Sequence, residues 1–486
     1  MPRFNFYVRL VGIMLPLLVL SCQQGTKIAT SQSKYQLPNS ANTTLLKEYT
    51  AKRDAAYEYK VVNEIKGEGY STFIIKLISQ KWLSDKEVKD PIWWHWLTVV
   101  VPDGVEVNTA MLVIGGGNRK SPIPTKHDDM ALQLALGSQS IVANLHNVPN
   151  QPMEFVNDDY GPRVEDELIA YGWKQFLDGG SKDADATWLA RFPMTNAAVR
   201  AMDALVDFTS KKDIPTIEKF VVTGASKRGW TTWTTAIVDD RVVAIIPIVI
   251  DMLNAIPSFQ HHWQVYGKWA AAIGDYEKMG IMEWQNSKEY ARLMEITEPY
   301  TYKDELTLPK LLLNATGDQF FIPDSWQFYW NDLKGEKHLR YVPNSEHSMG
   351  GTDVLETVGS FYQMILAKQE RPTFDWSVKN GTIYIQTHPK FQPTSITLWQ
   401  AHNPNARNFQ VDEIGKSYKA SEIPKTADGQ YAISIPSPQK GYAAFYVELA
   451  FLGLETLPLK LSTGVLVTPD TYPFEPFKPL KPMGKE

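Results

Sequence analysis

One serine lies where the chain is expected to turn from a strand into a helix. The apolar run 219–223 leads into Gly224-Ala225-Ser226, and a helix-compatible segment, 230–238, follows. Such a turn lifts the serine Oγ above the end of a sheet, where it can attack a carbonyl carbon. The usual motif is Gly-x-Ser-x-Gly, whereas here Arg228 occupies the last position and Gly229 comes one residue later. The sequence of strand, turn and helix predicts a nucleophilic serine despite this departure.

A serine nucleophile of this kind needs an acid and a base, which follow it in the chain in the order Asp or Glu, then His. Asp318 lies just past the apolar run 310–314, and His347 lies in the turn after the next apolar run. The carboxyl ends of parallel strands share one edge of a sheet, where active sites form. We expect His347 to take the proton of Ser226 and Asp318 to orient the imidazole. Asp251, at the end of an earlier apolar run, is the reserve acid.

Backbone N–H groups are expected to stabilise the oxyanion that forms when the serine attacks. Lys227 directly follows Ser226 at the start of the predicted helix, where the helix dipole favours negative charge. The second donor is assigned to Gly116 or Gly117, in the glycine-rich loop after the apolar run 110–114. This loop lacks the Gly-Lys-Ser/Thr ending of a phosphate-binding loop. A plain tight turn is the alternative interpretation of the loop.

Neither a metal nor a cofactor is expected. His127-Asp128-Asp129 and the pair His261-His262 lack the spacing of a specific metal site, and we interpret both as loop or lid residues. The chain contains 1 Cys, which excludes a disulfide framework and a thiolate metal site within one chain. The aromatic run 93–96 is interpreted as part of a core strand rather than a platform for sugar stacking.

The candidate residues require a parallel sheet that brings strand ends together. Short apolar runs at 110–114, 140–145, 219–223, 242–250, 310–314 and 338–342 suit strands buried on both faces. Three earlier strands are expected at 57–65, 71–79 and 93–101. We predict an α/β-hydrolase domain over 46–370, a three-layer α/β sandwich, with a helical lid at about 252–308. Short alternating strands predict a β-sandwich over 371–470, followed by a poorly ordered tail at 471–486.

The overall composition is that of a globular protein. The chain has 486 residues, 43% of them hydrophobic, with a net charge of −5 and no long basic run. The charge gives no electrostatic basis for binding nucleic acid. The length is ample for more than one domain.

The N-terminus is typical of an exported protein. Arg3 and Arg9 precede a short apolar run, and Ser21 stands before the single cysteine, Cys22. We predict a signal peptide at 1–21 and a lipid anchor on Cys22, because the serine and cysteine resemble a bacterial lipobox. Residues 22–45 are then a tether, and the expected location is the bacterial cell envelope or the exterior. A plain secretory signal with an incidental Cys22 is the alternative.

Several of these motifs together resemble a known family. The segment 224–230, the run Gly317-Asp318-Gln319-Phe320-Phe321 and Pro323-Asp324-Ser325 are similar to the PhoPQ-activated pathogenicity-related family. That resemblance covers most of the mature chain and implies an α/β-hydrolase fold with a serine-hydrolase triad. A more distant similarity is to glucuronoyl esterases, whose elbow has the spacing Gly224-x-Ser226-x-x-Gly229. By that analogy Lys227 stands where those enzymes carry an arginine that assists the oxyanion.

The residues favour a cell-envelope serine hydrolase. We expect a carboxylic ester rather than a peptide as substrate, either a small molecule or a sugar ester. Lys227 and Arg228 beside the nucleophile favour a substrate that carries a carboxylate. Two alternatives stay open. One is a non-catalytic binding or signalling protein on a hydrolase scaffold. The other is a surface protein that binds carbohydrate through the C-terminal sandwich.

Overall fold

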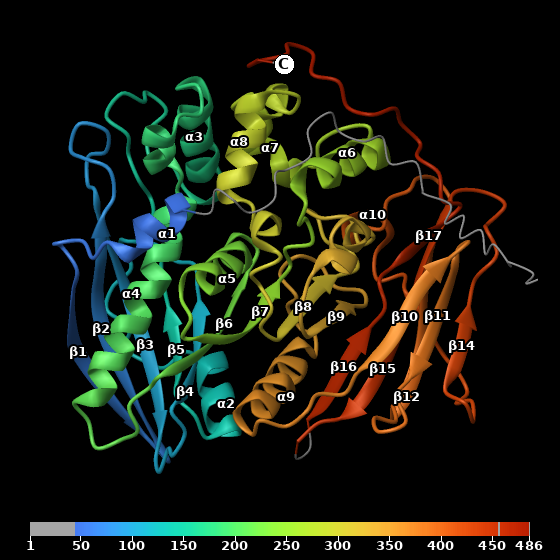
Figure 1. Cartoon of the computed structure of the whole chain (residues 1–486), viewed down its shortest axis with the longest axis horizontal. Coiled ribbons are helices and arrows are strands. Elements are labelled where there is room, and N and C mark those ends of the chain that lie inside the picture. The colour runs from blue at the N-terminus through green and yellow to red at the C-terminus, as the bar shows by residue number, and fades with distance from the viewer. Residues whose placement is uncertain (1–43, 455–456, 486) are drawn as a thin grey trace, which may run out of the picture. The chain divides into compact units, whose positions relative to one another are not determined.

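A mixed nine-stranded sheet forms the centre of the protein (Figure 1). The computed structural model describes residues 44–454 and 457–485, which fall in one compact unit. The strand order is β1-β2-β3-β5-β4-β6-β7-β8-β9. The strands are β1 Glu58–Gly67, β2 Tyr70–Lys81, β3 Ile92–Pro102, β4 Thr109–Ile114, β5 Val142–Leu145, β6 Lys219–Ala225, β7 Val242–Ile248, β8 Lys310–Ala315 and β9 Lys337–Val342.

The sheet changes direction where the sequence pattern changes. The pairs β1–β2, β2–β3 and β3–β5 are antiparallel, and all pairs from β5 through β4 to β9 are parallel. Every residue of β8 is buried, as a mostly apolar strand covered on both faces requires. At the antiparallel edge, no residue of β1 is fully buried. The strands expected from the apolar runs are confirmed.

Helices cover the two faces of the sheet. One group, whose members contact one another, comprises α1 Thr44–Ala51, α4 Arg191–Ser210 and α5 Lys227–Val238. A second pair in mutual contact comprises α2 Asp129–Ser138 and α9 Val354–Leu366. The result is the three-layer α/β sandwich that the sequence predicts. None of the described helices is both long and apolar enough to cross a membrane.

A helical insertion separates β7 from β8, within the segment expected to form a lid. It contains α6 Ala255–Tyr266, α7 Gly274–Lys278 and α8 Lys288–Thr297, with the short 3-10 helices η2 Ala271–Ile273, η3 Ile281–Trp284 and η4 Pro299–Tyr302. The helix α3 Glu165–Asp178 packs against α7 and α8. The insertion and α3 together stand beside the carboxyl ends of β6 and β7.

The C-terminal part adds two further sheets, as expected. One contains β10 Phe374–Lys379, β11 Thr382–Thr387 and β14 Gln430–Ile433. The other contains β12 Ser395–Asn403, β13 Lys419–Glu422, β15 Tyr442–Leu452, β16 Pro458–Ser462 and β17 Leu466–Thr468. Phe374 of the first stacks on Phe451 of the second, with ring centroids 6.3 Å apart. The second sheet meets β9, where the Tyr341 N–H donates to Ser462 Oγ at 2.9 Å.

The segment 471–485 differs from the poorly ordered tail expected from its proline and lysine content. It runs along the insertion, where the Phe474 N–H donates to the Gln264 carbonyl at 3.1 Å and the Met483 N–H to the Glu283 carbonyl at 3.0 Å. Phe477 is only 6% exposed, and its ring lies 4.8 Å from that of Trp263. The buried aromatic ring supplies the apolar contact that composition alone does not reveal.

Candidate active site

Ser226 occupies a strained turn between β6 and α5. Its backbone angles are φ 58° and ψ −127°, a combination that costs a non-glycine residue about 1–3 kcal/mol. A Cβ at Gly224 would lie 2.8 Å from the Arg228 carbonyl oxygen, and one at Gly229 would lie 3.0 Å from that of Ile248. Glycines at these two positions therefore let the helix pack closely against the strands. Position 228 does not need a glycine for this close packing, and an arginine can therefore occupy it.

His347, which is partly exposed, pairs with the buried Asp318 just past the ends of two neighbouring strands. His347 Nδ1 lies 2.9 Å from Asp318 Oδ1 and 2.8 Å from Oδ2. Asp318 is 2% exposed, and its Oδ1 also accepts the backbone N–H groups of Phe320 and Phe321 at 2.7 and 3.2 Å. These bonds fix the carboxylate, and the carboxylate holds the imidazole with Nε2 available to exchange a proton.

Aromatic rings connect the His–Asp pair to the cavity beside Ser226. The Phe320 ring lies 4.3 Å from the His347 ring, and the Phe321 ring lies 5.9 Å from it. Both phenylalanines line the same cavity as Ser226. Among the described residues, neither Ser226 Oγ nor His347 Nε2 has a hydrogen-bond partner. The elbow and the His–Asp pair thus flank one cavity without a direct hydrogen bond between them.

Asp251, the reserve acid, has other partners. Its two carboxylate oxygens accept the phenol protons of Tyr329 at 2.6 Å and Tyr341 at 2.5 Å. Burial raises the pKa of the Asp251 carboxyl to about 8. The carboxyl that contacts His347 is therefore that of Asp318, not that of Asp251.

The candidate oxyanion donors lie around the elbow. Lys227 lines the cavity and directly follows Ser226 as the first residue of α5. A Cβ at Gly116 would meet the Arg228 guanidinium at 2.9 Å, and one at Gly117 would meet the Asn147 nitrogen at 3.1 Å. The Asn147 N–H donates to the Gly116 carbonyl at 2.7 Å, which fixes the glycine loop. The two glycines are not part of the cavity wall.

The two cations beside Ser226 are neutralised by acids on α3 that the sequence reasoning missed. Lys227 Nζ lies 2.8 Å from both Glu165 Oε2 and Asp166 Oδ2. Arg228 Nη2 lies 2.6 Å from Glu165 Oε1. Burial alone would raise the pKa of Glu165, but the bonds and charges of Arg228 and Lys227 outweigh it and lower the pKa to about 2. The expectation that these cations face a substrate carboxylate is therefore not supported by their contacts.

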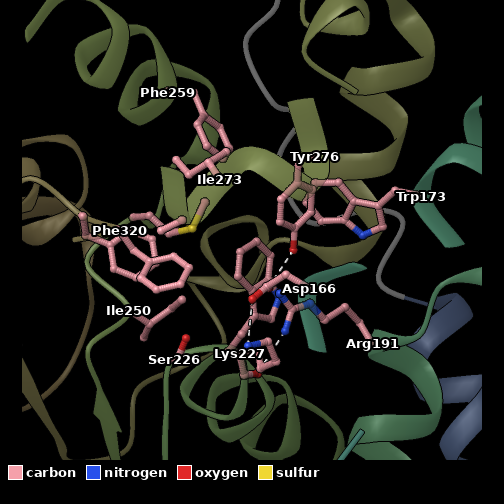
Figure 2. A pocket seen from close by; sticks show the side chains of 14 residues that line it. Asp166, Trp173, Arg191, Ser226, Lys227, Ile250, Phe259, Ile273, Tyr276 and Phe320 are labelled. Carbon is pink, nitrogen blue, oxygen red and sulfur yellow. Dashed lines mark hydrogen bonds and ion pairs between the residues drawn. The ribbon is translucent and has the colours of Figure 1, made fainter. Parts of the chain in front are cut away.

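The cavity is mainly apolar and aromatic (Figure 2). Its empty volume is about 470 Å³. Ser226, Asp166, Arg191 and Lys227 are its polar lining residues. The apolar and aromatic wall comprises Trp173, Trp230, Ile250, Met252, Phe259, Ala272, Ile273, Tyr276, Phe320 and Phe321. A smaller neighbouring space of about 250 Å³, lined by Asp251 and His262 among others, shares Met252, Phe259, Ile273, Phe320 and Phe321 with it.

The histidine clusters have structural partners. His261 Nε2 lies 2.8 Å from Asp324 Oδ1, and its Nδ1 lies 2.9 Å from the Tyr472 hydroxyl. His262 Nε2 accepts the Ala270 N–H at 3.1 Å, and burial lowers its pKa to about 3. In the part of the chain that the structure describes, no group of three or more His, Cys, Asp or Glu is placed to hold a metal. Cys22 lies outside the described residues.

The chain is similar to several known proteins. The model of the PhoPQ-activated pathogenicity-related protein family matches residues 46–410. Autocrine proliferation repressor protein A of Dictyostelium discoideum is 36% identical over 460 residues, which cover 89% of this chain and 92% of that protein. An acetyl xylan esterase from Paenibacillus sp. R4 has a TM-score of 0.47 at 14% identity, covering 69% of this chain and 98% of its own.

A glucuronoyl esterase from Solibacter usitatus has a TM-score of 0.38 at 14% identity, covering 68% of this chain and 92% of its own. The family assignment does not depend on these two structures, because the family model and the Dictyostelium relative each extend over most of the chain. By both measures the chain belongs to the PhoPQ-activated pathogenicity-related protein family.

Proposed function

We propose that the protein is a serine hydrolase that cleaves carboxylic esters, with Ser226 as nucleophile, His347 as base and Asp318 as the acid that orients it. The observation that carries this proposal is the Asp318–His347 pair, whose imidazole contacts Phe320 and Phe321 in the wall of the cavity that Ser226 lines. The strained conformation of Ser226 supports it, since such strain is retained where function requires it.

The reaction would follow the acyl-enzyme route. Ser226 Oγ attacks the ester carbonyl carbon while its proton passes to His347 Nε2. The oxyanion accepts the backbone N–H of Lys227, the predicted donor that lines the cavity. The carbon–oxygen bond to the alcohol then breaks, and His347 returns the proton to the leaving alkoxide. Water, deprotonated by His347, attacks the acyl group and restores Ser226.

The cavity favours esters over peptides. The aromatic and apolar wall beside Ser226 suits the apolar body of a small or medium ester. A folded protein or long peptide would need an open groove. The insertion between β7 and β8 contributes Phe259, Ile273 and Tyr276 to the wall, and we propose that it acts as a lid.

For the location we propose the bacterial cell envelope or the exterior, with the membrane reached through a lipid on Cys22. The apolar run and Ser21-Cys22 support this proposal. Mass spectrometry of the protein from a bacterial membrane fraction tests it, because a lipidated N-terminal Cys22 is heavier than the unmodified cysteine. Cleavage at another position, or an unmodified Cys22, would contradict it.

A second candidate is a signalling protein without catalysis on the same scaffold. It is favoured by one observation, the name of the Dictyostelium relative as a proliferation repressor. The two candidates differ in whether Ser226 turns over an ester.

A panel of p-nitrophenyl esters from acetate to octanoate tests the proposal. We expect hydrolysis by the wild type, loss of about a thousandfold or more in Ser226→Ala, and unchanged rates in Ser210→Ala at the exposed end of α4. Equal rates in wild type and Ser226→Ala would contradict a serine hydrolase and favour the signalling protein.

A further inference from the structure

We propose that Arg191 binds a carboxylate on the substrate, so that the preferred esters combine an apolar body with an acidic group. This inference rests on the proposed function and assigns a specificity-determining residue to the same cavity. It replaces the expectation that Lys227 and Arg228 would recognise such a group.

Arg191 is fixed next to the nucleophile. It is the first residue of α4 and is 4% exposed, yet it lines the cavity with Ser226. Its Nη1 donates to the Lys227 carbonyl at 2.9 Å, and Lys227 directly follows Ser226. The guanidinium carbon lies 4.4 Å from the centre of the Trp230 ring. The backbone contact and the aromatic face hold the guanidinium in one place.

Arg191 lacks the counter-charge that its neighbours have. Among the described residues no carboxylate lies within 4.0 Å of its guanidinium, whereas Lys227 and Arg228 both have such partners. Arginine stays protonated in proteins, so it cannot escape the cost of burial by losing its charge. Burial nevertheless lowers the pKa of Arg191. A buried cation without an ion pair is complementary to an incoming anion.

One edge of the Arg191 guanidinium has the geometry that binds a carboxylate. Arg191 Nε is fully buried and has no hydrogen-bond acceptor. Nε belongs to the edge with which arginine forms paired hydrogen bonds to a carboxylate. Another polar neighbour of the guanidinium is the Tyr276 phenol, which interacts with Arg191, is kept neutral because burial raises its pKa, and donates its own proton to Asp166 at 3.1 Å.

The charges of the local cluster do not cancel. Arg191, Lys227 and Arg228 are three cations, and among the described residues only two carboxylates, those of Glu165 and Asp166, lie within ion-pair distance of any of them. Asp166 lies beyond ion-pair distance of Arg191 and is already bonded to Lys227 and Tyr276. A substrate carboxylate at Arg191 would bring this cluster to neutrality.

The cavity separates a charged side from an apolar one. In Figure 2, the charged residues Arg191, Lys227 and Asp166 lie on one side together with the aromatic Trp173 and Tyr276, and only apolar residues, Phe259, Ile273 and Phe320, are labelled on the other. A ligand with a carboxylate at one end and an aromatic or aliphatic body matches this division.

A pair of ligands that differ only in charge tests the proposal without turnover. We would titrate 4-phenylbutyrate and its neutral isostere 4-phenylbutanamide into the protein by isothermal titration calorimetry. The wild type is expected to bind the acid at least tenfold more tightly than the amide. Arg191→Gln should lose this preference and Arg191→Lys should keep part of it, because lysine retains the charge but not the planar edge. Arg53→Gln, at an exposed position, should leave it unchanged.

Equal affinities for acid and amide in the wild type, or no binding of either, would overturn the proposal even if Arg191→Gln fails to fold. A preference for the acid over the amide that remains in Arg191→Gln would also overturn the proposal. Binding is measured independently of ester cleavage. A preference for the carboxylate without any ester hydrolysis would therefore contradict the proposed function but support the assignment of Arg191. Ester hydrolysis without that preference would support the proposed function but contradict the assignment of Arg191.

Discussion

Asp318 contacts His347 Nδ1 through both carboxylate oxygens, at 2.9 and 2.8 Å, while its Oδ1 also accepts two backbone N–H groups of the following loop. The carboxylate is therefore fixed before substrate arrives. This arrangement selects the tautomer of His347 in which Nε2 is unprotonated and can act as a base.

The first prediction concerns that tautomer. Asp318→Asn should lower kcat for p-nitrophenyl esters by about a thousandfold or more, because the amide no longer stabilises the imidazolium. KM should change much less, since Asp318 does not line the cavity. Steady-state kinetics measure both. Asp251→Asn is the matched control, and an equal loss of kcat there would contradict the assignment of Asp318 as the acid.

The second prediction concerns the pH dependence of stability. Burial raises the pKa of Asp251 from 3.8 to about 8, so the folded protein keeps a proton that the unfolded chain releases. Between those pH values the unfolded state binds fewer protons, and this group makes the protein less stable as pH rises. Asp251→Asn removes the titration. The free energy of unfolding of the variant, relative to wild type, should therefore rise from about pH 4 to pH 8.

Urea denaturation at several pH values measures this difference. Asp375→Asn, a substitution of an exposed aspartate in β10, is the control and should give a constant difference. A difference between Asp251→Asn and wild type that is also constant over this range would show that Asp251 titrates normally.

The third prediction concerns the C-terminal segment. Phe477→Ala should lower the free energy of unfolding by about 3 kcal/mol, because it empties the contact with Trp263 and Trp269. Phe474→Ala, at a ring that is 49% exposed, should cost less than half as much. Hydrogen exchange in α6 should also accelerate in Phe477→Ala. An unchanged exchange rate in α6 would mean that the segment does not stabilise the insertion.

Much of the fold follows from local sequence patterns. The short, mostly apolar runs that form β6 and β8 suit strands covered on both faces, which favours a parallel sheet between helices. Ser226, Asp318 and His347 were identified because each follows the end of such a run. These three residues are therefore predicted from their positions after expected strands, and not from their residue types alone.

The electrostatics of the site could not be predicted in the same way. Glu165 and Arg191 lie on α3 and α4, far in sequence from the residues they neighbour in space, and neither belongs to a motif. The acidic first turn of α3 is visible in the sequence, but the helix packing that brings it to Lys227 is not. The role of Phe477 was missed for the same reason, since a single aromatic residue among prolines does not identify the surface that buries it.

The central claim is that Ser226 is an activated nucleophile, and covalent labelling tests it most directly. The purified mature protein would be treated with a fluorophosphonate and its intact mass compared with that of Ser226→Ala. We predict one adduct on the wild type and none on Ser226→Ala, with Ser210→Ala labelled like the wild type. A folded wild-type protein that acquires no adduct, or a Ser226→Ala variant that is labelled equally, would contradict the account.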